Sequence, residues 1–200
     1  MNPNEKNNLL SRRNILKASL LSSAAVATMP AVAINRNPGG GFNPTPTCGT
    51  LTTSQTEGPY FSPGSPLKTN IREARYPGTL LVVKGKVTSD CDPVEGALLD
   101  FWQADDGGNY DNNGYRFRGH QFTNADGEYY LETIIPGLYP GRTRHIHVKV
   151  QKPNGRILTT QLYFPGESGN SRDFIYDPSM LLNMSVVNGV QVGEFDFVVV

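Results

Sequence analysis

The chain has 200 residues, of which 38% are hydrophobic, which is enough for one domain with a substantial core and too few for two ordinary domains. Its formal net charge of +0 gives no electrostatic basis for a nucleic-acid partner, and no run of like charges is long enough to form an interaction tail. The 21 glycines and 15 prolines indicate a chain rich in turns.

Residues 1–33 have the features of a twin-arginine export signal. Arg12 and Arg13 precede a weakly apolar run that ends near Pro30, and Ala31-Val32-Ala33 matches the small-residue cleavage pattern. The run is too short to span a bilayer comfortably, which needs about 20 apolar residues. A short amphipathic helix of the mature fold is the alternative. We therefore expect an exported protein, periplasmic or extracellular, that contacts a membrane only during export.

The remainder divides into a linker and a folded domain. Residues 34–47 consist largely of Asn, Pro, Gly and Thr, which predicts a linker, and residues 48–200 are expected to form the domain. Cys48 and Cys91 are the only cysteines, and both follow the signal. An even number of cysteines in an oxidising compartment predicts a disulfide between them, whereas two free buried thiols are the alternative.

Short apolar segments alternate with turn signals such as Pro-Gly and Pro-Asn-Gly through the whole domain. This pattern predicts an all-β fold, a β-sandwich of short, mostly antiparallel strands with long irregular loops. In the last segment, Phe195, Phe197 and Val199 are expected to share one face. The strands are expected at residues 79–88, 97–104, 128–134, 145–151, 157–164 and 193–200.

Two of the three histidines, His145 and His147, lie two residues apart in one of these segments. In a strand, alternate side chains point to opposite faces, so both imidazoles would share one face while Ile146 and Val148 fill the other. One metal ion could use such a pair, and imidazole suits iron, copper, zinc and nickel alike. Two histidines that merely face water are the alternative.

The surrounding residues narrow this choice, because the same stretch contains a Pro-Gly-x-Tyr-Pro turn and two arginines. Further motifs precede and follow it. The motifs are Glu57-Gly58-Pro59-Tyr60, Trp102-Gln103-Ala104, Gly107-Gly108-Asn109-Tyr110, Asp126-Gly127-Glu128-Tyr129, Pro136-Gly137-Leu138-Tyr139-Pro140, His145-Ile146-His147 and Gln161-Leu162-Tyr163-Phe164. In this combination the chain resembles the intradiol ring-cleavage dioxygenases, especially the catalytic (beta) subunits of the protocatechuate 3,4-dioxygenases.

The resemblance implies one Fe(III) ion per chain, held by Tyr110, Tyr139, His145 and His147. It also implies that a catecholic substrate and O2 react to give a cis,cis-muconate-type product, with Tyr139 accepting a substrate proton. Arg142 matches the family arginine that stabilises negative charge on the ring, and Arg144 is the alternative for that role. Tyr60, Trp102 and Gln161 match positions near the family's substrate pocket.

One further tyrosine and one further histidine, Tyr115 and His120, are considered as site residues. Tyr115 competes with Tyr110 as a ligand, and the Gly-Gly-x-Tyr match favours Tyr110. His120 has no counterpart in the resemblance and is expected to be a surface histidine.

The sequence also departs from the pattern of the resemblance. Only five residues separate Tyr139 from His145, and Gly141 stands where a pocket tryptophan is usual, so the substrate's ring substituents stay undetermined. The chain lacks a long helical region for dimerisation, and the sequence leaves a homo-oligomer open. Rival interpretations are a transthyretin-like β-sandwich binding module without catalysis and an exported zinc protein that uses the histidine pair alone.

Overall fold

The structure is a computed structural model that describes residues 49–200. The predicted export signal, the linker and Cys48 lie outside the described residues, so these predictions and the Cys48–Cys91 disulfide stay predictions. Within the described part of the chain, no helix is long and apolar enough to cross a membrane.

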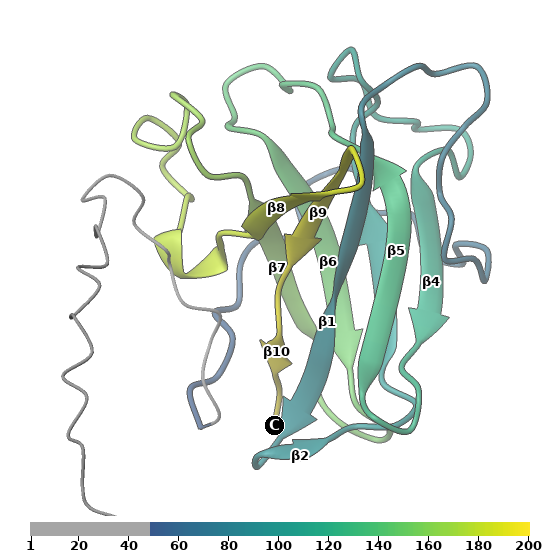
Figure 1. The fold of residues 1–200 in the computed structure, drawn as a ribbon, viewed down its shortest axis with the longest axis vertical. Helices are drawn as coiled ribbons and strands as arrows, with labels where there is room; N and C mark the ends of the chain where they lie inside the picture. The colour runs from purple at the N-terminus through teal and green to yellow at the C-terminus, as the bar shows by residue number, and fades with distance from the viewer. Residues whose placement is uncertain (1–48) are drawn as a thin grey trace, which may run out of the picture. The chain divides into compact units, whose positions relative to one another are not determined.

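The described residues form two sheets, and the only helix among them is the 3-10 turn η1 (Pro178–Met180). Both sheets are visible as two layers in Figure 1. The larger sheet has the order β10-β1-β9-β8, with β5 and β2 also paired to β1, and the smaller has the order β4-β3-β6-β7. The strands are β1 (Leu80–Ser89), β2 (Asp92–Pro93), β3 (Leu98–Trp102), β4 (Arg118–Phe122), β5 (Glu128–Ile134), β6 (His145–Gln151), β7 (Leu158–Tyr163), β8 (Asn183–Val187), β9 (Val190–Glu194) and β10 (Phe197–Val198).

The prediction of an all-β sandwich with mostly antiparallel strands is confirmed. Among the strand pairs of the described residues, those of β1 with β9 and with β10 are parallel, and the pairs of the smaller sheet are all antiparallel. The core lies between the sheets and is filled mainly by alternate residues of β1, β3, β5 and β6, as half-buried sheets require. Phe195, Phe197 and Val199 all belong to this core, as predicted.

Two segments were predicted incompletely. The strand β4 was missed because Arg-Gly-His-Gln-Phe has no apolar alternation, although Arg118 and Gln121 are buried. The expected strand at 193–200 is instead the end of β9 followed by β10, and β9 forms a hairpin with β8 through Asn188-Gly189. Both turn residues have positive φ (51° and 81°), which is the conformation that favours an Asn-Gly hairpin.

The smaller sheet has a second face that points away from the core. Strand β6 directs Ile146, Val148 and Val150 into the core, so His145 and His147 lie on the outer face, as predicted. Segments on either side of the strands cover this face. The main chain at Gln55 hydrogen-bonds to Thr159 of β7, and the main chain at Lys68 hydrogen-bonds to His120 of β4. Side chains on this covered face are therefore withdrawn from water.

Candidate metal centre

His145 and His147 are the centre of a cluster of imidazole and phenol groups on this covered face. The two side chains are buried, and their Nε2 atoms lie 3.1 Å apart. The Nδ1 atom of His145 lies 2.6 Å from the carbonyl oxygen of Thr143. In a neutral ring Nδ1 therefore carries the hydrogen and donates it, which leaves the Nε2 lone pair of His145 directed at the cluster.

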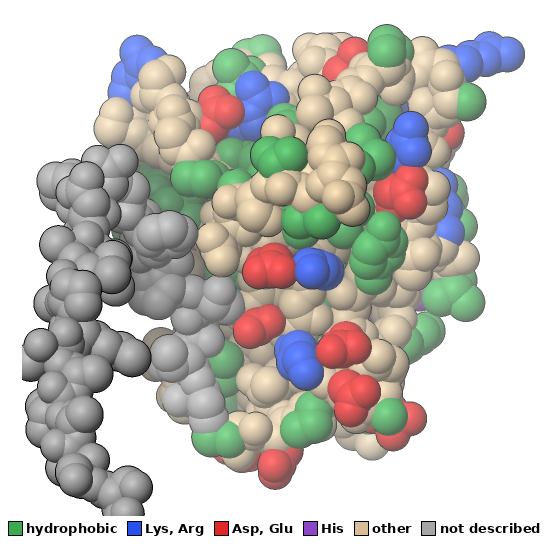
Figure 2. All heavy atoms as spheres, in the orientation of Figure 1, with side chains coloured by type: hydrophobic (Ala, Val, Ile, Leu, Met, Phe, Trp, Pro, Cys, Tyr) green, Lys and Arg blue, Asp and Glu red, His purple; other side chains and the backbone are tan. Residues whose placement is uncertain are grey.

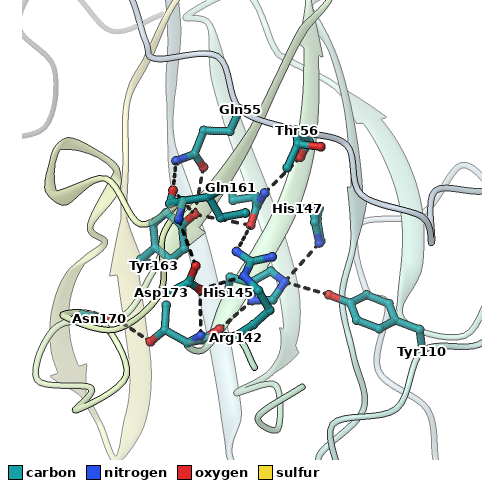
Figure 3. A network of polar contacts seen from close by, with 12 residues as sticks. Gln55, Thr56, Tyr110, Arg142, His145, His147, Gln161, Tyr163, Asn170 and Asp173 are labelled. Carbon is teal, nitrogen blue, oxygen red and sulfur yellow. Dashed lines mark hydrogen bonds and ion pairs between the residues drawn. The ribbon is translucent and has the colours of Figure 1, made fainter. Parts of the chain in front are cut away.

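Tyr110 contributes the first phenol, whose hydroxyl lies 3.0 Å from His145 Nε2 (Figure 3). A tight turn directly before Tyr110 places it there. The Asp105 carboxylate accepts hydrogen bonds from the backbone amides of Gly107 and Asn109. This turn explains why the sequence has glycine twice just before the tyrosine.

The same turn brings the second tyrosine loop close to the first. The Gly137 amide donates to the carbonyl oxygen of Asp105 at 2.7 Å. Gly108 has a φ of +84°, and a Cβ atom there would overlap the carbonyl oxygen of Leu138. The close backbone approach therefore holds Tyr110 and Tyr139 on adjoining loops.

Tyr139 joins the cluster through aromatic contacts and through Tyr60. Its ring lies edge-on to that of Tyr110, with centroids 5.8 Å apart, and its hydroxyl is hydrogen-bonded to that of Tyr60 at 2.6 Å. The Tyr60 ring stacks on Tyr110 with centroids 4.6 Å apart and 16° between the planes. The predicted residues Tyr60, Tyr110 and Tyr139 therefore lie together.

Arg142 is fixed on the other side of the histidines, as Figure 3 shows. Its Nε atom donates to the Asp173 carboxylate at 2.8 Å, and its Nη2 atom donates to Gln161 Oε1 at 2.7 Å. Arg144 is directed elsewhere, because it donates to Glu167 and to the carbonyl oxygen of Pro136. Of the two arginines, Arg142 is therefore the one that is held beside the imidazoles.

Trp102 and Gln161 support the cluster from behind. Trp102 lies opposite His147 across β3 and β6, and the two rings stack with centroids 4.8 Å apart and 8° between the planes. The amide of Gln161 accepts from Arg142 and donates to the carbonyl oxygen of Thr56. Trp102 is 1% exposed and Gln161 0% exposed, so both side chains are packed against the cluster, and their place near the substrate stays a prediction.

Burial sets the protonation of these groups. Burial and the nearby Arg142 lower the pKa of His145 to about 4, so the ring is neutral near pH 7. Burial, followed by the charges of its neighbours, also lowers the pKa of His147. Burial raises the pKa of Tyr110 above the ordinary phenol value, so a phenolate here requires a strong positive partner.

The donor set fits a ferric ion. His145 Nε2 lies 3.0 Å from the Tyr110 hydroxyl and 3.1 Å from His147 Nε2, and phenolate oxygen is a hard ligand that suits a hard trivalent cation. Residues 49–200 contain no group of three or more His, Cys, Asp or Glu that could hold a metal ion. Within the described residues the imidazole pair is therefore accompanied by phenol oxygen and not by a further His, Cys, Asp or Glu side chain.

Comparison with known proteins identifies the family. The family profile described as Dioxygenase matches residues 56–198. The chlorocatechol 1,2-dioxygenase of Pseudomonas sp. (strain P51) is 30% identical over 174 residues, which cover 72% of this chain and 68% of that protein. The chain belongs to the intradiol ring-cleavage dioxygenase family.

Two further proteins show how far this similarity extends within the dioxygenase family. The dioxygenase domain of a dioxygenase carbohydrate-binding protein fusion from Streptomyces sp. SirexAA-E is 55% identical, with a TM-score of 0.73, and the match covers 75% of this chain and 98% of that chain. The protocatechuate 3,4-dioxygenase beta chain of Burkholderia cepacia is 32% identical over 120 residues, which cover 50% of this chain and 51% of that protein. The chain spans about half to two thirds of the length of these curated relatives.

The structure also separates the site of this dioxygenase from nearby residues of the same types. Tyr115 is 42% exposed and donates its hydroxyl to the carbonyl oxygen of Pro63, so it is not part of the cluster. His120 is half-buried and its Nδ1 atom lies 2.7 Å from the carbonyl oxygen of Ser65. The predicted surface histidine is therefore only partly exposed, because residues 65–68 lie along β4 there.

Several residues that shape the cluster were not found from the sequence. Asp173 fixes Arg142, but it lies in a loop after β7 with no recognisable motif. Arg118 is 1% exposed, and its Nη2 atom donates to the carbonyl oxygen of Asp111, next to Tyr110. Asp105 did have a recognisable signal, because Asp105-Asp106-Gly107-Gly108 is typical of a turn in which an aspartate carboxylate accepts hydrogen bonds from backbone amides.

Proposed function

We propose that this protein is a ferric dioxygenase that cleaves a catecholic ring between its two hydroxylated carbons and yields a cis,cis-muconate-type product. The observation that carries the proposal is that the Tyr110 hydroxyl and His147 Nε2 lie 3.0 and 3.1 Å from His145 Nε2, with Tyr139 on the adjoining loop. Relatives named chlorocatechol 1,2-dioxygenase and protocatechuate 3,4-dioxygenase support a catecholic substrate.

In this proposal Tyr110, Tyr139, His145 and His147 hold one Fe(III) ion, which when bound would supply Lewis acidity and a template that orients the diol. The neutral imidazoles are suited to ligation because neither must lose a proton first. Tyr139 is the group that accepts a proton from the diol, and the Tyr60 hydroxyl, 2.6 Å away, is its hydrogen-bond partner.

Arg142 stabilises the negative charge that develops on the deprotonated substrate. A guanidinium that is already held in place by Asp173 and Gln161 does not need to reorganise when this charge appears. The two hydrogen bonds use the Nε hydrogen and one hydrogen of Nη2, so three of the five guanidinium hydrogens remain available to a substrate.

The experiment that tests the function uses iron-supplied protein and a panel of plain, carboxylated, chlorinated and hydroxylated catechols. We expect the wine-red colour of ferric tyrosinate, oxygen uptake with at least one catechol, and both atoms of 18O2 in a muconate-type product. Tyr110→Phe should lose the colour, whereas Tyr115→Phe, which lies outside the cluster, should keep it. Colourless iron-supplied protein, or a product that contains no 18O, would contradict the proposal.

We also propose that the protein is exported through a twin-arginine signal in residues 1–33 and carries a Cys48–Cys91 disulfide. The sequence features that support both are the Arg12-Arg13 pair and the even number of cysteines. Replacing both arginines by lysine should retain the protein in the cytoplasm. Mass spectrometry of exported protein with and without reductant should show a gain of two hydrogens on reduction, and two free thiols before reduction would refute the disulfide.

A further inference from the structure

Lys149 lies on the same face of β6 as His147 but takes no part in the cluster described above. Its side chain is 17% exposed and forms an ion pair with the Glu57 carboxylate. The same ammonium lies 3.5 Å from the centroid of the Phe61 ring. One partly buried cation therefore contacts the first and the last residue of the segment Glu57–Phe61.

This segment is a turn that is fastened mainly by side chains. The main chain is hydrogen-bonded to the smaller sheet at Gln55 and at Thr56, whose link to Gln161 is visible in Figure 3. The next main-chain hydrogen bond to another segment in the described part of the chain is at Pro63. Between these points, the contacts of Glu57 and Phe61 hold the turn against β3 and β6.

Further contacts seat the turn on the metal-binding face. The Phe61 ring lies edge-on to Trp102, with centroids 4.9 Å apart, and Trp102 in turn stacks on His147. Gly58 has a φ of +70°, and a Cβ atom there would lie 3.5 Å from Cε1 of His147. The turn is thus packed directly on the residues behind the imidazole pair.

Tyr60 is carried by this turn, between the two residues that Lys149 contacts. Its ring stacks on Tyr110 and its hydroxyl bonds to that of Tyr139. A phenol can contact two other phenols at once only if its backbone is positioned accurately. The contacts that fix the turn therefore also fix the position of Tyr60.

We propose that Lys149 is a positioning residue that fastens the turn Glu57–Phe61 to β6 and thereby holds Tyr60 against Tyr110 and Tyr139. The ammonium is suited to this role because it is attracted to the carboxylate of Glu57 and to the face of the Phe61 ring at the same time. The inference goes beyond the proposed function and rests on it only for its kinetic consequence.

The first test measures hydrogen–deuterium exchange of the full-length protein in peptides that cover residues 57–61. Lys149→Met keeps the aliphatic stem and removes the charge, so exchange in this turn should rise about tenfold, the effect expected from losing about 1.4 kcal/mol of local contacts. Lys149→Arg keeps both attractions and should restore slow exchange. Lys84→Met is the matched control, because it removes an exposed ion pair with Glu194 on the other sheet and should leave the turn unchanged.

A second measurement separates positioning from general stability. Iron-supplied Lys149→Met should keep the ferric-tyrosinate colour, because none of the four proposed ligands is changed, while its kcat/KM with a catechol should fall about tenfold. Glu57→Gln removes the ion pair but leaves the contact between Lys149 and Phe61, so exchange should also rise, by less than in Lys149→Met. This variant keeps the test usable if the lysine variant folds poorly.

Unchanged exchange at residues 57–61 in both variants would overturn the proposal. So would loss of the iron colour in Lys149→Met with an unchanged turn, since Lys149 would then support the sheet instead. If no catechol is turned over by the wild-type protein, the proposed function fails, whereas the exchange experiment still decides the role of Lys149.

Discussion

The two sheets share one core, but their outer faces differ in what covers them. On the larger sheet Lys84 pairs with Glu194 and Lys86 with Glu128, and these four side chains are between 47% and 51% exposed. Figure 2 shows basic and acidic side chains side by side on this face. On the smaller sheet His145 and His147 are 4% and 3% exposed. Polar groups on the first face are solvated by water, whereas those on the second must satisfy one another or a bound ion.

The difference shows that loops, more than the sandwich itself, create the site. Strands β1 and β6 alternate in the same way, with one set of residues in the core and one outside it. Within residues 49–200, the segments that carry Tyr60, Tyr110 and Tyr139 cover the outer face of the smaller sheet. The sheet therefore fixes the positions of the two histidines, and the covering segments add the tyrosines that complete the candidate metal centre.

The largest effect is expected from His147→Ala. Loss of a nitrogen ligand should lower iron affinity by more than about 100-fold, since even residues that only support a ligand cost 10- to 100-fold. The variant should be colourless and inactive, as judged by iron analysis and oxygen uptake. His120→Ala is the control, because this histidine lies on the same sheet but outside the cluster. A red, active His147→Ala protein would show that the covered face of the smaller sheet is not the metal centre.

Arg142→Met should separate binding of iron from catalysis. The variant removes a charge that is positioned before the reaction, so turnover should fall by about 100- to 1,000-fold while the colour is retained. Arg144→Met should have a much smaller effect, because Arg144 is directed to Glu167 and away from the imidazoles. Equal losses in the two variants would mean that Arg142 has no special role.

The sequence predicted the centre of the site better than its supports. His145 and His147 were predictable because a two-residue spacing in a strand fixes one face, and Tyr110 and Tyr139 because they belong to motifs. Asp173 and Lys149 could not be predicted, since their roles arise when a loop after β7 and a turn before β1 fold back onto β6. Such contacts join residues far apart in the chain and leave no local pattern.

The strands, like the site residues, were predictable where they have a local sequence pattern and were missed where they depend on distant contacts. Strands with apolar alternation, such as β5 and β6, were predicted with their observed bounds. Strand β4 was missed because its buried residues include an arginine and a glutamine, which are held by neighbours from other segments. The β8–β9 hairpin did carry a signal, because Asn-Gly between valines is typical of a two-residue turn.

Gly108→Ala tests whether the adjoining loops hold the two tyrosines together. The added Cβ would overlap the Leu138 carbonyl oxygen, and the backbone has a φ that disfavours alanine, so we expect a loss of about 1–3 kcal/mol in the free energy of unfolding. Iron occupancy should fall with it, measured together with the melting temperature. Gly189→Ala has a similar φ of +81° but open space around it, so it should cost less stability and leave iron occupancy unchanged. Equal effects on iron occupancy in the two variants would show that the Gly108 contact does not position the tyrosines.

The smallest effect is expected from Lys84→Met on the larger sheet. The ion pair with Glu194 is about half exposed, so water and salt already screen most of its attraction, and its removal should change the free energy of unfolding by less than about 0.5 kcal/mol. Iron content and turnover should match those of the wild-type protein, because no covering segment rests on this residue. Chemical denaturation at low and at high salt measures the free energy of unfolding and its screening, and iron analysis and oxygen uptake measure the iron content and the turnover. A large loss of activity would show that the solvated face is coupled to the site, and the contrast between the two faces would then have to be abandoned.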